Sequence, residues 1–269
     1  MKVLAWDTSS AQGVIGAFEY MPEGPKIVSE WTLGLDTAKH SERLLWGIDQ
    51  VLRSAGWSLN DLGALVVGVG PGSFTGIRIG VTTARILSSQ LNIPVCPVSS
   101  LQIIARPVAE WVLSQKKVKK NSHLVVALTD AAKGEWFSMM GTAENLTKRK
   151  KPKSIRDECL APEEVFKRVK KSKLVPVFVG SAVQRHEELF KGFRKLQNQD
   201  WKCFQSFPFG SVTPRALMQL GWENIEMKSL LPSEKLVPQY LRGSEAEVKL
   251  KKGLLKESPT SGTFKSRLP

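Results

Sequence analysis

Cysteine and histidine are scarce in this chain. Only three cysteines, Cys96, Cys159 and Cys203, occur in 269 residues, and they lie far apart and never at the spacing of metal ligands. An odd number of widely separated cysteines excludes a disulfide framework and a zinc site built on paired cysteines. The sequence therefore predicts reduced cysteines and a cytoplasmic location.

Long apolar runs are also missing. Although 42% of the residues are hydrophobic, no uninterrupted apolar segment approaches the ~20 residues that cross a bilayer. Residues 1–7 lead directly into strand-like sequence, without the apolar core and cleavage site of a secretory signal. We expect no membrane association, and the length allows one or two domains with a full core.

The net charge of +14 lies entirely in the second half of the chain. Residues 1–115 contain 8 Lys and Arg against 9 Asp and Glu, whereas residues 116–269 contain 31 against 16. Such asymmetry indicates a polyanionic partner, with nucleic acid as the first candidate. A lysine-rich surface that only maintains solubility explains the same numbers.

The stretch 62–91 organises the first half. It predicts a buried strand over 64–69, a tight loop over 70–76 and a helix to about residue 90. A glycine-rich turn between a strand and a helix directs backbone N–H groups at one point, which suits an anion. The glycine spacing matches neither the phosphate-binding loop nor the dinucleotide fingerprint.

The predicted anion site combines this loop with the polar turn that follows the first strand, residues 3–6. Its residues are Asp7, Thr8, Ser9, Gly70, Gly72, Ser73, Thr75 and Gly76. Two other interpretations stay open. The loop can be tight for packing alone, and Asp7 can form a turn with its own backbone.

Small residues recur every fourth position on the helix after the loop. Gly76, Gly80 and Ala84 therefore share one face, although glycine inside a helix costs about 1 kcal/mol relative to alanine. Either this face packs on the protein's own sheet, or it is a groove for a partner. The helix predicted over 40–56 has its own wide apolar face.

The second half begins at the charged connector 115–122. We predict one subdomain over 1–114 and a smaller, basic one over 115–242, with the last helix, which starts near 213, packing back on the first subdomain. Residues 243–269 have little apolar periodicity, and we expect a disordered basic tail.

Six motifs keep one order along the chain, and together they resemble the TsaB (YeaZ) family from residue 1 to about 242. They lie at residues 7–9, 40–45, 70–80, 98–101, 130–135 and 240–242. The resemblance implies an α/β fold of the actin-like ATPase type (ASKHA, RNase H-like) with two subdomains. It also implies a role in forming N6-threonylcarbamoyladenosine (t6A) at position 37 of tRNAs.

The resemblance further implies partners. TsaB pairs with its paralogue TsaD as a heterodimer, the ATPase TsaE joins them, and tRNA is bound through the complex. A homodimer is expected when TsaD is missing. We expect this chain to bring no cofactor of its own, so that ATP and a metal ion enter the complex through the partners.

The chemistry of the transfer is expected to lie in TsaD, which carries an Asn-His-x-x-x-His run for metal. The corresponding segment here, 98–104, has Ser100 and Ile104 at the two histidine positions, and isoleucine binds no metal. We therefore expect no metal site and no catalytic residue, and a scaffold and activating role. The alternatives are an ATP-binding phosphotransferase or hydrolase of the same fold and, less favoured, a glycoprotease-like peptidase.

Two contact surfaces complete these expectations. The resemblance implies pairing through helices 41–55 and 76–90, and the candidate interface residues are His40, Ser41, Leu44, Leu45, Ile48, Leu52, Gly76, Gly80 and Ala84. The candidates for tRNA contact are the basic loop residues Lys148, Arg149, Lys150 and Lys151.

Overall fold

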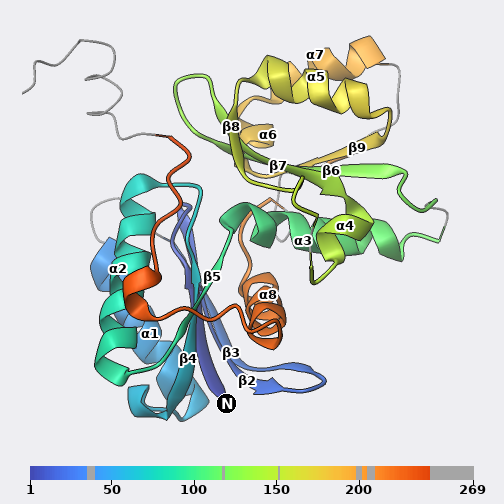
Figure 1. Cartoon of the computed structure of the whole chain (residues 1–269). Coiled ribbons are helices and arrows are strands. Elements are labelled where there is room, and N and C mark those ends of the chain that lie inside the picture. Colours follow the sequence, from blue (N-terminus) through green and yellow to red (C-terminus); the bar gives the residue numbers. More distant parts are fainter. Residues whose placement is uncertain (35–39, 117–118, 151, 198–201, 205–209, 243–269) are drawn as a thin grey trace, which may run out of the picture.

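The computed structural model describes residues 1–34, 40–116, 119–150, 152–197, 202–204 and 210–242. These residues form two mixed β-sheets, one from each half of the chain, with helices on their faces (Figure 1). None of the helices in this part of the chain is long and apolar enough to span a membrane.

The first sheet has the strand order β3-β2-β1-β4-β5. Strand β1 pairs in parallel with β4 and antiparallel with β2. Nearly every residue of β1 and β4 is buried, as expected for central strands that are covered on both faces. The strands are β1 (Lys2–Asp7), β2 (Gln12–Met21), β3 (Gly24–Gly34), β4 (Leu62–Gly68) and β5 (Val95–Val98).

The second sheet repeats this arrangement. Its order is β10-β9-β6-β7-β8, so each strand has the same neighbours as its counterpart in the first sheet. Strand β6 is parallel to β9 and antiparallel to β7, as β1 is to β4 and β2. The strands are β6 (His123–Asp130), β7 (Trp136–Thr142), β8 (Glu158–Leu160), β9 (Val175–Val179) and β10 (Lys202–Phe204). This duplicated topology agrees with the actin-like fold.

Two helices, α1 (His40–Ala55) and α2 (Phe74–Leu91), cover one face of the first sheet (Figure 1). Their apolar sides form one cluster with strands β1, β2 and β4. Ser73 caps the N-terminus of α2, because its side chain accepts a hydrogen bond from the Gly76 N–H group. Asn92, in the left-handed conformation, caps the C-terminus.

The other face of each sheet is covered by a helix that the opposite half supplies. Helix α3 (Ser100–Ser114) follows the first sheet in the chain but packs on β6 and β7. Helix α8 (Pro214–Glu226) follows the second sheet and packs on β1, β2, β3 and β5. One continuous core therefore contains residues of both sheets and both helices, and the crossing is visible in Figure 1.

A buried ion pair joins the two crossing helices. The Arg106 guanidinium of α3 donates to both carboxylate oxygens of Glu223 on α8, at 2.8 and 2.5 Å. Arg106 also donates to Glu110, one turn further along α3. Removing one partner of such a pair leaves a buried charge uncompensated, which typically costs about 3–5 kcal/mol.

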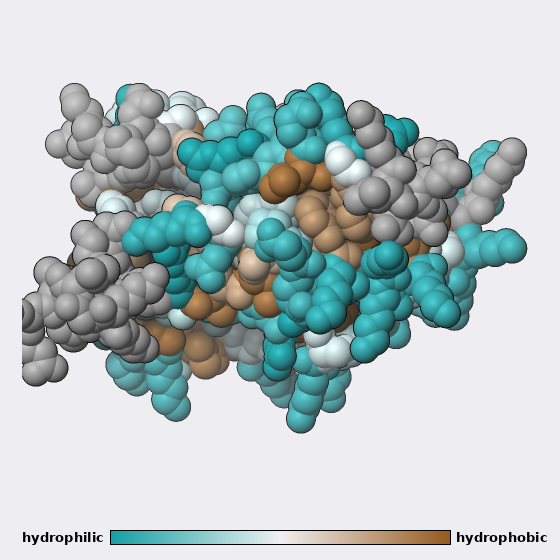
Figure 2. Space-filling model, turned by 90° about the horizontal axis from the view of Figure 1, so that it is seen from above, coloured by the Kyte–Doolittle hydropathy of each residue, from teal (hydrophilic) through white to brown (hydrophobic). Residues whose placement is uncertain are grey.

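Shorter helices cover the outer face of the second sheet. An aromatic cluster lies beneath them, with Trp136 stacked on Phe190 and Phe166 stacked on Phe193. Viewed from above, hydrophilic side chains dominate the surface and surround a smaller hydrophobic area (Figure 2). The remaining helices are α4 (Ala143–Thr147), α5 (Pro162–Ser172), α6 (Ser181–Arg185) and α7 (Glu187–Gln197), with 3-10 turns at Leu59–Asp61 and Ser233–Lys235.

The small-residue stripe of α2 faces inward, so the prediction of an external groove is wrong. A Cβ atom added at Gly76 would overlap the Thr8 carbonyl oxygen, and one added at Gly80 would overlap the Thr8 hydroxyl. Ala84 is fully buried. The glycines are needed because strand β1 and its following turn approach the α2 backbone closely.

This packing predicts opposite effects for two glycine-to-alanine changes. Gly80→Ala should lower the free energy of unfolding by about 1–3 kcal/mol, because its methyl group overlaps Thr8. The control is Gly192→Ala on α7, where nothing lies near the new methyl group, and stability should rise by about 0.5–1 kcal/mol. Urea unfolding measures both changes. A stabilised Gly80→Ala variant would contradict the inward packing.

Candidate functional site

The glycine loop is clamped to the turn that follows β1. The Ser73 N–H donates to the Ser9 carbonyl oxygen at 2.7 Å. A Cβ at Gly72 would overlap that same oxygen, and Gly70 has a φ of +101°, which favours glycine. The loop and the turn therefore hold each other, and the space beside Gly72 is occupied by the protein's own backbone.

Asp7 is fully buried at the centre of this region. Its Oδ1 accepts hydrogen bonds from the Ser9 N–H and hydroxyl groups at 2.8 and 2.6 Å, and its Oδ2 accepts one from the Ser100 hydroxyl at 2.5 Å. Burial raises the pKa of Asp7, while these hydrogen bonds lower it. The Thr8 hydroxyl donates to the Gly76 carbonyl at 2.7 Å. The predicted anion-site residues are thus brought together, and the polar side chains of Asp7, Thr8 and Ser9 are engaged in hydrogen bonds within the protein.

Ser100 and Ile104, the two positions where the resemblance places histidines in TsaD, have other contacts here. Ser100 binds Asp7 through its hydroxyl, and Ile104 is buried in the core. Among the residues that the structure describes, no group of three His, Cys, Asp or Glu side chains is placed to hold a metal ion.

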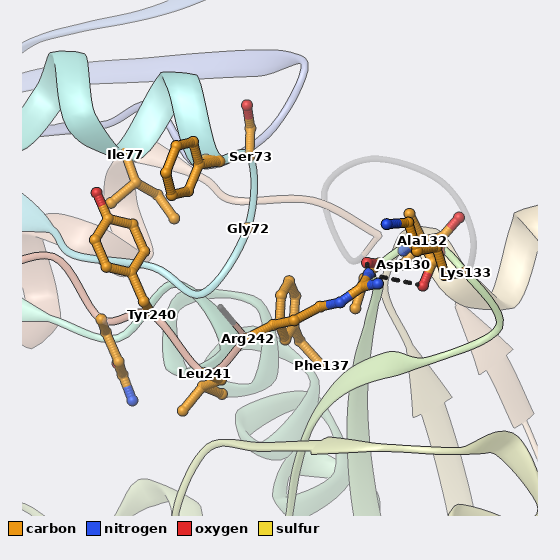
Figure 3. A pocket seen from close by; sticks show the side chains of 13 residues that line it. Gly72, Ser73, Ile77, Asp130, Ala132, Lys133, Phe137, Tyr240, Leu241 and Arg242 are labelled. Atoms are coloured by element: carbon orange, nitrogen blue, oxygen red, sulfur yellow. Dashed lines mark hydrogen bonds between the residues drawn. The ribbon is translucent and has the colours of Figure 1, made fainter. Parts of the chain in front are cut away.

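A cavity of about 330 Å³ lies between the two halves (Figure 3). Its walls are mostly apolar and come from α2, β7 and the segment 239–242. Polar groups of the β6–β7 turn and Arg242 lie at its edge. The residues that line it are Gly72, Ser73, Phe74, Ile77, Asp130, Ala131, Ala132, Lys133, Phe137, Gln239, Tyr240, Leu241 and Arg242.

The segment 239–242, called the strap below, connects the two halves. Arg242 donates to the carbonyl oxygens of Ala131 and Ala132 at 2.6 and 3.2 Å (Figure 3). Tyr240 packs against Phe74 and accepts a hydrogen bond from Arg78 at 2.8 Å. Among the ionisable groups at the cavity, the Asp130 carboxylate pairs with Arg185 within the second half.

The predicted interface residues divide between the inside and the outside of the molecule. Leu44, Ile48 and Leu52 are buried in the protein's own core, as are the small residues of α2. Only Leu45 points outward among the predicted leucines and isoleucine. The side chains of His40 and Ser41 lie outside the described part of the structure.

The basic loop lies beside α4 and α8. Lys148 donates to the Asn145 side chain at 2.8 Å, and the Arg149 guanidinium lies 4.7 Å from the Trp222 ring centroid. Lys150 is exposed. Lys151 falls outside the described residues, as does the predicted tail 243–269.

Comparisons with known proteins identify the family. The family model for TsaD, tRNA N6-adenosine threonylcarbamoyltransferase, matches residues 35–250. The TsaB protein of Bacillus subtilis is 27% identical over 250 residues, which cover 93% of this chain and 97% of that protein. Escherichia coli TsaB is 31% identical over 155 residues, or 57% of this chain and 62% of that protein.

The chain belongs to this family, in its TsaB/YeaZ branch. A solved structure of YeaZ from Pseudomonas aeruginosa has the same fold, with a TM-score of 0.65 at 22% sequence identity, and covers 89% of this chain and 99% of that one. The expectation that the chain is similar to TsaB (YeaZ) is therefore confirmed, and so is the expected fold.

Sequence reasoning missed one partly buried acid, Asp157, which lies just before β8. Burial raises its pKa to about 6, while hydrogen bonds from the Ser99 and Gln239 side chains lower it. Its Oδ1 atom is buried without a hydrogen-bond partner. These neighbours come from the start of α3 and from the strap, so no local pattern in the sequence indicates the environment of Asp157.

The raised pKa of Asp157 predicts that the free energy of unfolding depends on pH. Its pKa is higher in the folded chain, about 6, than in an unfolded chain, about 3.9. Its destabilising effect is therefore absent below pH ~4, grows as the pH rises, and is complete above pH ~6. Asp157→Asn should raise the free energy of unfolding at pH 7.5 by about 1–3 kcal/mol.

Denaturant unfolding at several pH values tests this effect. The difference between Asp157→Asn and the unchanged chain should shrink towards zero as the pH falls to about 4. Asp49→Asn is the control: it removes an exposed carboxylate that pairs with Arg53, so it should not raise the free energy of unfolding at pH 7.5. A difference that is the same at every pH would contradict the assigned environment.

Proposed function

We propose that this chain is a non-catalytic scaffold and activating subunit that pairs with TsaD for t6A formation in tRNA. Family membership supports the pathway, because the curated relatives are named as tRNA threonylcarbamoyladenosine biosynthesis proteins. The observation that carries the non-catalytic role is the use of Ser100 and Ile104. Ser100 donates a hydrogen bond to Asp7, and Ile104 is buried in the core. The resemblance places the metal ligands of TsaD at these two positions.

The outer sides of α1 and α2 are the proposed pairing surface. Leu45 and Trp46 on α1 are 55% and 52% exposed, and Ile86 on α2 is 57% exposed. Trp46 lies edge-on to Trp31 of β3, with ring centroids 5.4 Å apart. Large apolar side chains gathered on one exposed side are typical of contact surfaces. A paired arrangement of these helices can supply the ~1,200–2,000 Å² of a specific interface.

The same surface also explains the proposed homodimer. In the absence of TsaD a second copy of this chain can cover the apolar side chains, which gives a homodimer. TsaE then joins the heterodimer, and the ATP and metal ion of the reaction come with the partner subunits. This chain contributes binding energy and position rather than a reacting group.

Charged substitutions on this surface test the pairing. Leu45→Asp and Ile86→Asp should each weaken binding to TsaD at least tenfold, or about 1.4 kcal/mol, because they place a carboxylate in an apolar contact. Leu189→Asp is the matched control, since Leu189 is 48% exposed on α7 in the other half.

Calorimetric titration with purified TsaD measures the affinities, and circular dichroism checks that each variant remains folded. The control should bind as the unchanged chain does. If Leu45→Asp and Ile86→Asp also bind normally, the pairing surface lies elsewhere.

A further inference from the structure

Two basic stretches that are far apart in the sequence lie towards opposite ends of the short helix α4 in the structure. Residues 116–120 follow α3, and residues 148–153 follow α4. Together they contain nine Lys and Arg residues and no acidic residue. All seven of these basic residues that the structure describes are exposed.

Hydrogen bonds from Asn121, which follows the first stretch, join it to the start of α4. The Asn121 N–H donates to the Glu144 side chain at 2.6 Å, and the Thr142 hydroxyl donates to the Asn121 side chain. Helix α4 is five residues long, or about 7–8 Å at 1.5 Å per residue, and Lys148 follows it directly. The helix between the two stretches is therefore about as long as the Debye length at physiological salt, about 8 Å, so the fields of cations near its two ends overlap.

One cation of this group has a defined position. The Arg149 guanidinium lies over the Trp222 ring at 4.7 Å and is 3.8 Å from Glu226. Stacking on an aromatic ring limits the rotamers of the side chain, so less entropy is lost when the guanidinium binds a ligand. The nearby acid Glu144 accepts a hydrogen bond from Asn121. The described lysines of both stretches are exposed to solvent.

We propose that the described basic residues of the two stretches form one surface that binds the phosphate backbone of RNA; they are Lys116, Lys119, Lys120, Lys148, Arg149, Lys150 and Lys153. That the RNA is tRNA rests on the proposed function, whereas the phosphate binding rests on the charges alone. Several exposed cations on one part of the surface match a polyanion with closely spaced phosphates. Recognition of the backbone carries no sequence information, so this surface would position any tRNA that the complex modifies.

An anionic membrane is the other large polyanion, and the surface suits it poorly. Membrane-surface helices insert apolar side chains below the headgroups. Within residues 116–153, none of the described large apolar side chains is exposed, and Ala143 and Leu146 of α4 are buried.

The test pairs one lysine from each stretch. Lys120→Ala/Lys148→Ala removes two cations from the proposed surface, and Lys170→Ala/Lys171→Ala removes two exposed cations from the end of α5. The affinity of the full chain for an unmodified tRNA transcript is measured between 50 and 200 mM salt. The first variant should flatten the slope of log K against log[salt] by about 1.4–1.8, while the second leaves it unchanged.

Three results would overturn the proposal: no change in the slope of the first variant, an equal change in both variants, or binding to phosphatidylserine vesicles in place of tRNA. Affinity for TsaD is measured on the same samples. Loss of tRNA binding with normal pairing supports the proposed surface. Failure of the unchanged chain to pair with TsaD would contradict the proposed function. It would not affect the conclusion about phosphate binding, which rests on the salt dependence of the tRNA affinity alone.

Discussion

The exchange of helices α3 and α8 between the two sheets is the constraint on which the rest of this structure depends. Each helix covers the sheet of the other half, so neither half has a complete core alone. The Arg106–Glu223 pair fixes the register of the crossing, because its bidentate geometry is satisfied in only one arrangement. The segment 239–242 adds a second connection between the halves through Tyr240 and Arg242.

This packing engages several polar groups of the anion site that the sequence predicts. Asp7, Ser9 and Ser100 bind one another, and Gly72 and Gly76 allow the Ser9 and Thr8 carbonyl oxygens to approach closely. Side chains that remain available lie on the outside. They are the apolar side of α1 and α2 and the basic group around α4, and both suit contacts with other macromolecules.

Much of the fold follows from periodicity, but the contacts between distant segments do not. The helices near 40–56 and 76–90 and the central strands are visible in the sequence because their apolar residues recur regularly. Strands β8 and β10 are three residues long, too short for a period. The spacing of Gly76, Gly80 and Ala84 correctly predicts that they share one face of the helix. It does not show whether this face packs on the protein's own sheet or on a partner helix, because both need small residues. Asp157 and the Arg106–Glu223 pair depend on contacts between residues that are 58 to 117 positions apart in the sequence.

The central claim is that this chain activates a partner and has no transfer chemistry of its own. The most direct test is t6A formation in an unmodified tRNA transcript with threonylcarbamoyl adenylate, using this chain alone, TsaD alone and both together. The account predicts no product from this chain alone and the highest rate when both are present. Formation of t6A by this chain without TsaD, or a rate with TsaD that this chain does not raise, would contradict it.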